Sequence, residues 1–170
     1  MNKVALVTGS AKGIGRAIVE KLASEGYDVV INYLSSSELA FKLKDEIIDK
    51  YAVKCLAFKC DVSKVDEVDF MFDNVEKELG DVSVLVNNAA VDYANLFSLK
   101  TSEEFLRLLD VNVVGYFNTF KRAYKKMLKQ EYGRVINISS TNGINTYYPM
   151  SIDYDASKAA VISLTHNMAM

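Results

Sequence analysis

The chain has 170 residues, a formal net charge of −2 at pH 7, 50% hydrophobic residues and 25% charged residues. This balance is typical of a globular domain with a real core and excludes a disordered chain. The small net charge gives no reason to expect a nucleic-acid partner, and the longest apolar runs are too short to span a bilayer. With no signal peptide before a first strand that starts at Lys3, we expect a cytoplasmic protein without membrane attachment.

The cysteines and the histidine argue against a metal site. Cys55 and Cys60 lack metal-site spacing, and on one strand they would face opposite sides, so we expect buried, reduced thiols. His166 is the single histidine, which disfavours a histidine-based metal site or catalytic triad. We therefore expect no metal.

The N-terminal segment reads as a strand, a glycine-rich turn and a helix. Lys3–Thr8 is a short run rich in β-branched residues, which suits a buried parallel strand. After the turn, apolar residues recur every four positions, at Ile14, Ile18 and Leu22. Glycines let the backbone approach a pyrophosphate, and a helix N-terminus attracts its charge. The turn therefore predicts a dinucleotide site, although its Gly-x-x-x-Gly-x-Gly spacing differs from the familiar Gly-x-Gly-x-x-Gly and a chance glycine-rich loop is the minority alternative.

Strands and helices alternate along the rest of the chain. The further strands are expected at Asp28–Tyr33, Val53–Asp61, Val82–Val86 and Arg134–Ser139. The further helices are expected at Glu38–Lys50, 65–79, Ser102–Lys129 and from Tyr154 onward. This alternation predicts an α/β fold, a doubly wound parallel sheet of the Rossmann type in the order 3-2-1-4-5, forming a single NAD(P)-binding domain over residues 1–170.

Polar residues fall at the carboxyl ends of the expected strands, where such sheets bind ligands. They are Asp61 with Val62, the run from Asn87 to Ala90, and Ser139 with Ser140. Each is also a common turn or capping residue, and for Asp61 this structural alternative has nearly equal weight. Strand alternation points Ser139 and Ser140 in opposite directions.

Tyr154 and Lys158 form a Tyr-x-x-x-Lys pair. About one such pair is expected by chance at this composition, so in isolation a tyrosine beside a solvated lysine is the better interpretation. On a helix, however, the two side chains share a face, so the ammonium group is expected to favour the ionised phenol and to lower its pKa. A phenol adjusted in this way would serve as an acid and a base near neutral pH.

Together the motifs resemble the short-chain dehydrogenase/reductase family. The resemblance covers all 170 residues and follows the family's order of motifs: Thr8 to Gly15, Asn87-Asn88-Ala89-Ala90, Asn112, Ser140, Tyr154 and Lys158. Among its subfamilies, the chain is most similar to the bacterial 3-oxoacyl-[acyl-carrier-protein] reductases. One departure is Ala90, where the family usually has glycine, and its methyl group is expected to crowd the adenosine side.

The resemblance implies an NADP(H)-dependent reduction of a carbonyl to an alcohol. The implied catalytic residues are Asn112, Ser140, Tyr154 and Lys158. Tyr154 would donate the proton, Ser140 would hold the carbonyl oxygen, Lys158 would bind the nicotinamide ribose, and Asn112 would bend the long helix and hold a water. Asn112 by itself is better interpreted as a polar residue tolerated beside Gly115 in a helix, and only its place in the series of motifs favours the catalytic role. Tyr147 and Tyr148 are the alternatives for the acid, and neither has a lysine four residues later.

NADPH is favoured over NADH because no acid follows the second strand, where NAD-dependent proteins carry one. Lys12 is expected near the 2′-phosphate, although Lys12 and Arg16 as ordinary solvated charges would leave the preference undecided. The expected cofactor-binding residues are Gly9, Ser10, Lys12, Gly13, Ile14, Gly15, Asn32, Tyr33, Ser35, Asp61, Val62, Asn88, Ala89, Ala90, Tyr154 and Lys158.

Similar proteins are longer by roughly half, a size ordinary for one α/β domain. The chain is therefore expected to lack the family's sixth and seventh strands, its Pro-Gly segment and its substrate-covering loop, which leaves the fifth strand as an open edge. A homodimer or homotetramer is expected through two helices that carry Phe117, Phe120, Tyr124, Val161 and Leu164. Two functions remain open: a carbonyl reductase, with other alcohol or sugar dehydrogenases as variants, and a non-catalytic nucleotide-binding or assembly fragment.

Overall fold

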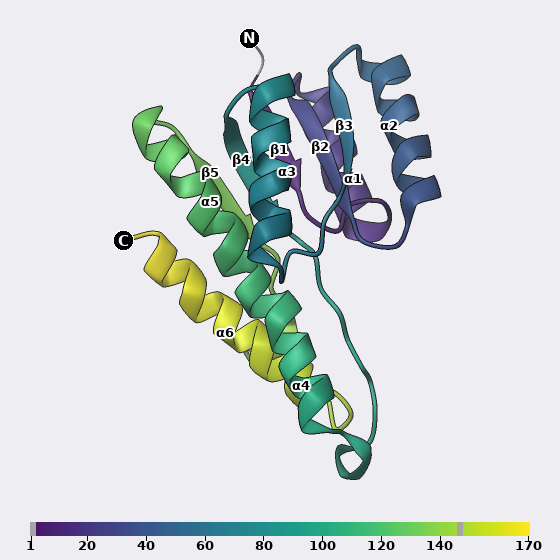
Figure 1. Ribbon diagram of the computed structural model, residues 1–170. Coiled ribbons are helices and arrows are strands. Elements are labelled where there is room, and N and C mark those ends of the chain that lie inside the picture. The colour runs from purple at the N-terminus through teal and green to yellow at the C-terminus, as the bar shows by residue number, and fades with distance from the viewer. Residues whose placement is uncertain (1–2, 146–147) are drawn as a thin grey trace.

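The computed structural model describes residues 3–145 and 148–170 and contains one five-stranded parallel sheet (Figure 1). Its order is β3-β2-β1-β4-β5, which confirms the predicted order 3-2-1-4-5. The strands are β1 (Val4–Val7), β2 (Asp28–Tyr33), β3 (Cys55–Lys59), β4 (Val82–Asn87) and β5 (Arg134–Asn137).

Helices cover both faces of the sheet. They are α1 (Gly13–Ser24), α2 (Ser37–Tyr51), α3 (Val65–Glu78), α4 (Ser102–Leu109), α5 (Gly115–Lys129) and α6 (Ile152–Met168), with short 3-10 turns at Phe97–Leu99 and Thr141–Gly143. One core cluster joins α1 and α2 to the sheet, and the second joins α3 and α5 to its other face. The two buried cysteines belong to opposite clusters and are unpaired, as the strand geometry predicts.

The expected helix stripes face the sheet except at their first residue, and in α1 Ile18 and Leu22 pack partly buried against the core. In α1, Ile14 is 65% exposed, and Gly15, Val19 and Ala23 are the buried residues instead. Leu39 in α2 and Val65 in α3 are also exposed, although the residues that continue their stripes are buried. The correction has a simple cause: each of these three residues lies in the first turn of its helix, beyond the end of the strand that the rest of the helix covers.

The long helix expected over Ser102–Lys129 is interrupted. A π-helical turn, Asp110–Val114, joins α4 to α5, so the two run almost end to end beside α6 (Figure 1). Single π turns inside helices often lie at functional sites. Asn112 is buried within this turn.

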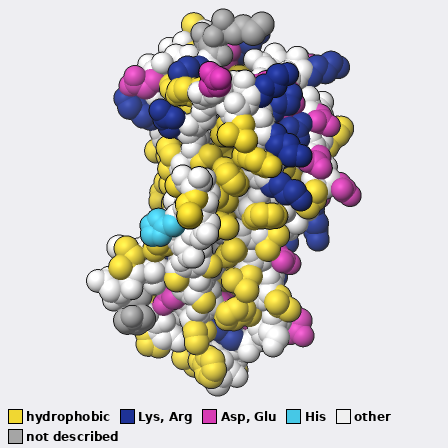
Figure 2. Space-filling model, turned by 90° about the vertical axis from the view of Figure 1, so that its left-hand side faces the viewer, with side chains coloured by type: hydrophobic (Ala, Val, Ile, Leu, Met, Phe, Trp, Pro, Cys, Tyr) yellow, Lys and Arg dark blue, Asp and Glu magenta, His cyan; other side chains and the backbone are white. Residues whose placement is uncertain are grey.

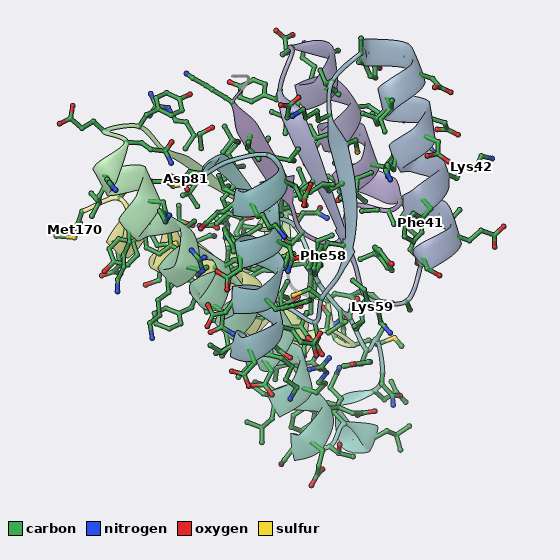
Figure 3. All side chains as sticks on the ribbon, turned by 45° about the horizontal axis from the view of Figure 1, so that its top comes forward. Phe41, Lys42, Phe58, Lys59, Asp81 and Met170 are labelled. Carbon is green, nitrogen blue, oxygen red and sulfur yellow. The ribbon has the colours of Figure 1, made fainter. Side chains whose placement is uncertain are left out.

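Aromatic contacts join the β3 side of the sheet to the helices α2 and α3. The rings of Tyr33 and Phe41 lie 6.1 Å apart between centroids, and those of Phe58 and Phe70 lie 5.8 Å apart. Figure 3 shows Phe41 on α2 and Phe58 on β3 in this region, far from Met170 at the C-terminal end. Within the described residues, no helix is long and apolar enough to cross a membrane.

The opposite edge of the sheet is open. β5 alternates exposed and half-buried residues, and Ile136 is exposed. A groove of about 830 Å³ lies beside it, lined by residues of α5, β5 and the end of α6. Figure 2 shows hydrophobic side chains running down the face on this side of the molecule, while most Lys and Arg side chains in view lie toward its upper part.

Candidate active site

The glycine-rich turn lies at the carboxyl end of β1 and leads into α1. Gly9 and Gly13 have φ angles of +61° and +60°, a conformation that favours glycine. A Cβ on Gly15 would lie 2.6 Å from Asn88 Nδ2 and 2.7 Å from the Cα of Ser10, so no side chain fits there. The turn therefore requires its glycines for backbone shape and for close packing against the segment after β4.

Side-chain hydrogen bonds hold this turn in place. Asn88 Nδ2 donates to the carbonyl oxygens of Thr8 and Gly9, at 2.9 and 3.0 Å. Asn32 Oδ1 accepts from the Gly9 amide at 3.0 Å, and its Nδ2 donates to the Cys60 carbonyl at 3.0 Å. The Ser10 hydroxyl is buried and donates to the Val7 carbonyl at 2.7 Å. The side chains of Asn32, Asn88 and Ser10 thus support the turn, and Asn32 and Asn88 also line the pocket that opens over it.

A pocket of about 490 Å³ opens over the turn and the ends of β2, β3 and β4. Most of the expected cofactor residues line it: Gly9, Lys12, Gly13, Ile14, Gly15, Asn32, Tyr33, Ser35, Asp61, Val62, Asn88, Ala89 and Ala90. The lining also includes Ala11, Leu34, Ser36, Cys60, Val91, Arg107 and Val111, which sequence reasoning did not select. Arg107 and Val111 are four residues apart in the α4 region, and only the packing of that helix brings them to the pocket.

The two basic residues near the turn have different surroundings. Arg16 donates to Glu20 at 2.8 Å and to Glu46 at 2.7 Å, and its hydrogen bond to Glu20 is the main cause that raises the pKa of Arg16. Lys12 is exposed on the pocket rim, and within residues 3–145 and 148–170 no acidic side chain pairs with it. Lys12 is therefore the cation available to a ligand, whereas Arg16 is already neutralised.

Asp61 is both a turn residue and a residue of the ligand pocket, the two interpretations that the sequence left open. Its Oδ1 accepts from the amide and the hydroxyl of Ser63, at 3.0 and 2.7 Å, as a turn residue does. Its Oδ2 accepts from Arg107 at 2.8 Å, and Asp61 also lines the pocket. Burial acts to raise the pKa of Asp61, but the hydrogen bonds from Ser63 and Arg107 outweigh burial and hold the pKa below its ordinary value.

Ser140 and Tyr154 meet beyond the end of β5. Burial is the largest effect on Tyr154 and raises the pKa of its phenol, a hydrogen bond with Ser140 opposes this, and Asp92 and Asp155 raise the pKa further. Ser139 points elsewhere, since its hydroxyl donates to the Lys158 carbonyl at 2.9 Å. Of the alternative acids, Tyr147 lies outside the described residues, and Tyr148 is exposed with its hydroxyl 3.4 Å from Met150 Sδ.

Lys158 is 1% exposed, and its ammonium group is bonded to the backbone just after β5. Its Nζ donates to the Ile138 carbonyl at 2.7 Å and lies 3.5 Å from the hydroxyl of Tyr116, with the Tyr154 ring centroid 5.6 Å away. Burial lowers the pKa of Lys158 to about 8. The expectation that this ammonium lowers the pKa of Tyr154 is therefore wrong for this structure, in which burial and two carboxylates determine the phenol's pKa.

Tyr116 is a member of this cluster that the sequence did not reveal. It is buried, donates its hydroxyl to the same Ile138 carbonyl at 3.2 Å, and has its pKa raised by burial. Its position in α5 resembles that of any aromatic core residue. Only the fold brings it to Lys158.

Asn112 fixes the π turn to its neighbours. Its amide accepts from the Val91 amide at 2.8 Å and donates to the Val91 carbonyl at 3.0 Å and to Ser157 Oγ at 3.1 Å. Ser157 in turn donates to the carbonyl of Tyr154 at 2.7 Å. Asn112 thus links the segment after β4 to the helix that carries Tyr154.

Comparisons with known proteins agree with this geometry. The family model described as "short chain dehydrogenase" matches residues 3–170. The 3-oxoacyl-[acyl-carrier-protein] reductase of Staphylococcus epidermidis is 41% identical over 169 residues, which are 99% of this chain and 68% of that protein. The reductase of the same name from Aquifex aeolicus is 36% identical over 167 residues, 98% of this chain and 66% of that protein.

Two solved structures are similar throughout the chain. An alcohol dehydrogenase from the archaeon Thermococcus sibiricus, complexed with 5-hydroxy-NADP, has a TM-score of 0.90 at 28% identity, covering 98% of this chain and 70% of that one. A gluconate 5-dehydrogenase from Burkholderia cenocepacia, in complex with NADP and tartrate, has a TM-score of 0.89 at 29% identity, covering 99% and 66%. The chain thus spans about two thirds of the length of these proteins.

Proposed function

The chain belongs to the short-chain dehydrogenase family, and from this premise we propose that it is an NADP(H)-dependent oxidoreductase that reduces a carbonyl to an alcohol. The observation that carries the proposal is that Ser140 lies close enough to Tyr154 to act on the pKa of its phenol, in a fold that also forms the glycine-lined pocket. The domain is proposed to act as one NAD(P)-binding unit.

The pocket fits a dinucleotide. No side chain caps the N-terminus of α1 among the described residues, so its first amide groups are open to a phosphate. Gly9, Gly13 and Gly15 keep the approach clear, and Lys12 supplies an unpaired charge at the rim. Lys12 would hold the 2′-phosphate of NADP(H), and the ends of β3 and β4 would hold its adenosine half. When bound, NADPH supplies the hydride.

The protein's own part of the reaction is proton delivery. The raised pKa of Tyr154 keeps its phenol protonated at neutral pH, as an acid that donates to a carbonyl oxygen must be. Ser140 hydrogen-bonds that phenol and would hold the same oxygen as negative charge develops. Lys158 would bind the ribose beside the nicotinamide, and Asn112 would position α6 through Ser157.

For the substrate we propose a 3-oxoacyl thioester carried on an acyl-carrier protein. The sequence identity of 41% to a reductase of that name supports this class of substrate. The two similar solved structures are an alcohol dehydrogenase and a gluconate 5-dehydrogenase. Other short-chain alcohols and sugars are therefore the alternative substrates. A non-catalytic nucleotide-binding or assembly role is the alternative of a different kind, which the open edge at β5 favours.

The test is NADPH consumption with a 3-oxoacyl thioester, a short ketone and 5-ketogluconate, using the wild-type chain and Tyr154→Phe. We expect the thioester to be reduced fastest, and Tyr154→Phe to lower turnover by about 10²–10⁴-fold while NADPH affinity changes little. NADPH binding without turnover on any substrate would favour the nucleotide-binding alternative. Wild-type turnover by Tyr154→Phe would place the acid elsewhere.

A further inference from the structure

A buried ion pair joins the first turn of α6 to the segment after β4, which runs down to the start of α4 in Figure 1. Lys100 Nζ lies 2.6 Å from Asp153 Oδ1, and the two side chains are 6% and 0% exposed. Lys100 Nζ also donates to the carbonyl oxygen of Tyr93 at 2.7 Å. Asp153 Oδ1 in turn accepts from the amide of Tyr154, the residue proposed as the acid, at 3.0 Å. The lysine thus connects the chain at Tyr93 to the backbone of Tyr154.

Stability does not explain why this pair is buried. Removing two charges from water is costly, and the attraction between them often does no more than offset that cost. The second carboxylate oxygen of Asp153, Oδ2, adds to the cost, because it is buried and accepts no hydrogen bond from residues 3–145 and 148–170. Apolar side chains of similar volume would fill the same space without this penalty. The pair is therefore better explained by the geometry that it imposes than by the stability that it adds.

A second series of hydrogen bonds joins the same segment to Tyr154. Asn112 binds the amide and the carbonyl of Val91, and its Nδ2 also donates to Ser157 Oγ at 3.1 Å. Ser157 donates to the carbonyl oxygen of Tyr154 at 2.7 Å. The lysine connection ends at the N–H of Tyr154, and this one ends at its C=O. Both connections begin within residues 91–93, so together they fix where that stretch lies relative to the acid.

Asp92 lies between the two anchored residues, and it is exposed. Burial is the largest effect that raises the pKa of the Tyr154 phenol, and the charge of Asp92 raises this pKa further. The other titratable groups around the phenol are Asp155, Lys158 and Tyr116. Of these four groups, Asp92 alone comes from the segment after β4. Its distance from the phenol therefore depends on the two connections.

We propose that Lys100 and Asp153 are positioning residues for proton transfer, which hold the start of α6, and with it Tyr154, against the segment after β4. This inference rests on the proposed function, in which Tyr154 is the acid. Neither Lys100 nor Asp153 lines the cofactor pocket, so their effect falls on the proton-transfer step and not on NADPH binding. A displacement of about 1 Å can lower the rate of a catalysed step by about 10²-fold, so loosening this connection should be visible in kcat.

The experiment measures kcat, NADPH affinity and thermal unfolding for the wild type, Lys100→Met and the double variant Lys100→Met/Asp153→Asn. The substrate is whichever of the 3-oxoacyl thioester, the short ketone and 5-ketogluconate the wild type reduces fastest. Lys100→Met leaves the Asp153 charge buried and unpaired, so it should unfold at a lower temperature. Its kcat should fall by about 10–100-fold, while its NADPH affinity stays within about twofold of the wild-type value.

The double variant separates positioning from stability. It removes both charges, so it should regain most of the thermal stability that Lys100→Met loses. It still lacks the connection to Tyr93, so its kcat should stay about tenfold or more below that of the wild type. If Lys100→Met does not fold, the double variant decides the question by itself.

Arg122→Met is the matched control. Arg122 is 19% exposed and lies 2.7 Å from Glu76, which is 16% exposed, in a bridge between α5 and α3. Breaking this pair should also lower the unfolding temperature, because Glu76 then loses its partner. Its kcat should remain within about twofold of the wild-type value, since this bridge does not lead to Tyr154.

The pH profile of kcat provides a readout that a purely structural role would not move. The acid must be protonated to donate, so kcat falls as the pH rises through the pKa of the phenol. When Lys100→Met frees the segment after β4, Asp92 and the burial that it shares no longer hold this pKa as high. The fall of kcat should then begin at a lower pH than in the wild type. Asp92→Asn should shift the profile in the same direction, and Arg122→Met should leave it in place.

A folded Lys100→Met variant with wild-type kcat and an unchanged pH profile would overturn the inference and leave the proposed function intact. Recovery of wild-type kcat by the double variant would do the same, because the pair would then contribute only to stability. Failure of the wild type to reduce any of the three substrates would overturn the proposed function and the inference together.

Discussion

The adjacent strands β4 and β5 show how differently two parts of one site are supported. Every residue of β4 is buried, and the segment after it is bonded to the glycine turn through Asn88. β5 alternates exposed and half-buried residues, and beyond its end Ser140 and Tyr154 depend on α6 and on short turns. The glycine turn is thus anchored to the buried part of the sheet, whereas the proposed catalytic pair, Ser140 and Tyr154, lies beside an open edge. Substitutions in the glycine turn should weaken folding and binding together. Substitutions of Ser140 or Tyr154 should affect one of the two without the other.

The largest effect is expected for Gly15→Val. The new Cβ would lie within 2.8 Å of the Gly9 carbonyl oxygen as well as 2.6 Å from Asn88 Nδ2, so the turn must move. We expect a loss of about 1–3 kcal/mol in the free energy of unfolding, as for an overpacked core, and NADPH affinity weakened by about 100-fold. Urea unfolding and NADPH fluorescence measure the two losses.

Ala17→Val is the control for this variant, because Ala17 is exposed in the same helix. It should change the free energy of unfolding by about 0.5 kcal/mol or less. Intact NADPH affinity in Gly15→Val would show that the turn does not need this glycine, and the contrast between the two regions would then be incorrect.

Lys158→Met should stabilise the free chain. The pKa of Lys158 is about 8 in the folded chain against 10.5 for the unperturbed group, so between these values the unfolded chain binds the extra proton and stability rises with pH. Below about pH 8 the full cost of the buried charge is present, and methionine removes it. After allowing for the lost bond to the Ile138 carbonyl, we expect about 1–2 kcal/mol of added stability at pH 7.

This gain should shrink between pH 8 and 9.5, while NADPH consumption is lost at every pH. Urea unfolding at both pH values is the measurement, and Lys129→Met, an exposed lysine in α5, is the control. If Lys158→Met is less stable than wild type at pH 7, the contacts of Lys158 stabilise the fold by more than the burial of its charge costs.

Lys12→Ala should separate the two cofactors. The substitution removes the unpaired charge at the pocket rim. NADPH affinity should therefore fall by about tenfold, which is near the lower end for the loss of a charge-assisted hydrogen bond. NADH affinity should stay within about twofold of the wild-type value, because NADH has no 2′-phosphate. Titrations of both cofactors against wild type, Lys12→Ala and the control Lys21→Ala measure the difference. Equal losses for the two cofactors would identify Lys12 as a surface charge only.

The smallest change in stability is expected for Phe117→Glu on α5. Phe117 is 47% exposed, whereas Val161, which we expected at the same contact between copies, is fully buried and belongs to the chain's own interior. If the chain forms the expected two-fold dimer through α5 and α6, the new charge should shift it toward monomer, with the free energy of unfolding of the monomer changed by about 0.5 kcal/mol or less. Light scattering at micromolar concentration measures this, and Ile136→Glu tests the β5 edge in parallel. If only Ile136→Glu dissociates the protein, association uses the open edge.

The sequence by itself determined the strands and helices, the glycine turn and the Tyr154–Lys158 pair, because each depends on local periodicity or on spacing within a few residues. The strand order followed from the alternation of these elements along the whole chain, which is typical of a doubly wound sheet. Only the tertiary structure decided how the polar groups are used. Asn32 and Asn88 support the turn, Arg16 is paired and Lys12 is not, Lys158 is directed toward Ile138, and Arg107 and Tyr116 join sites distant in sequence. A side chain's hydrogen-bond partners and its pKa are set by atoms that long-range packing brings within a few ångströms, and no local pattern in the chain encodes which atoms those are.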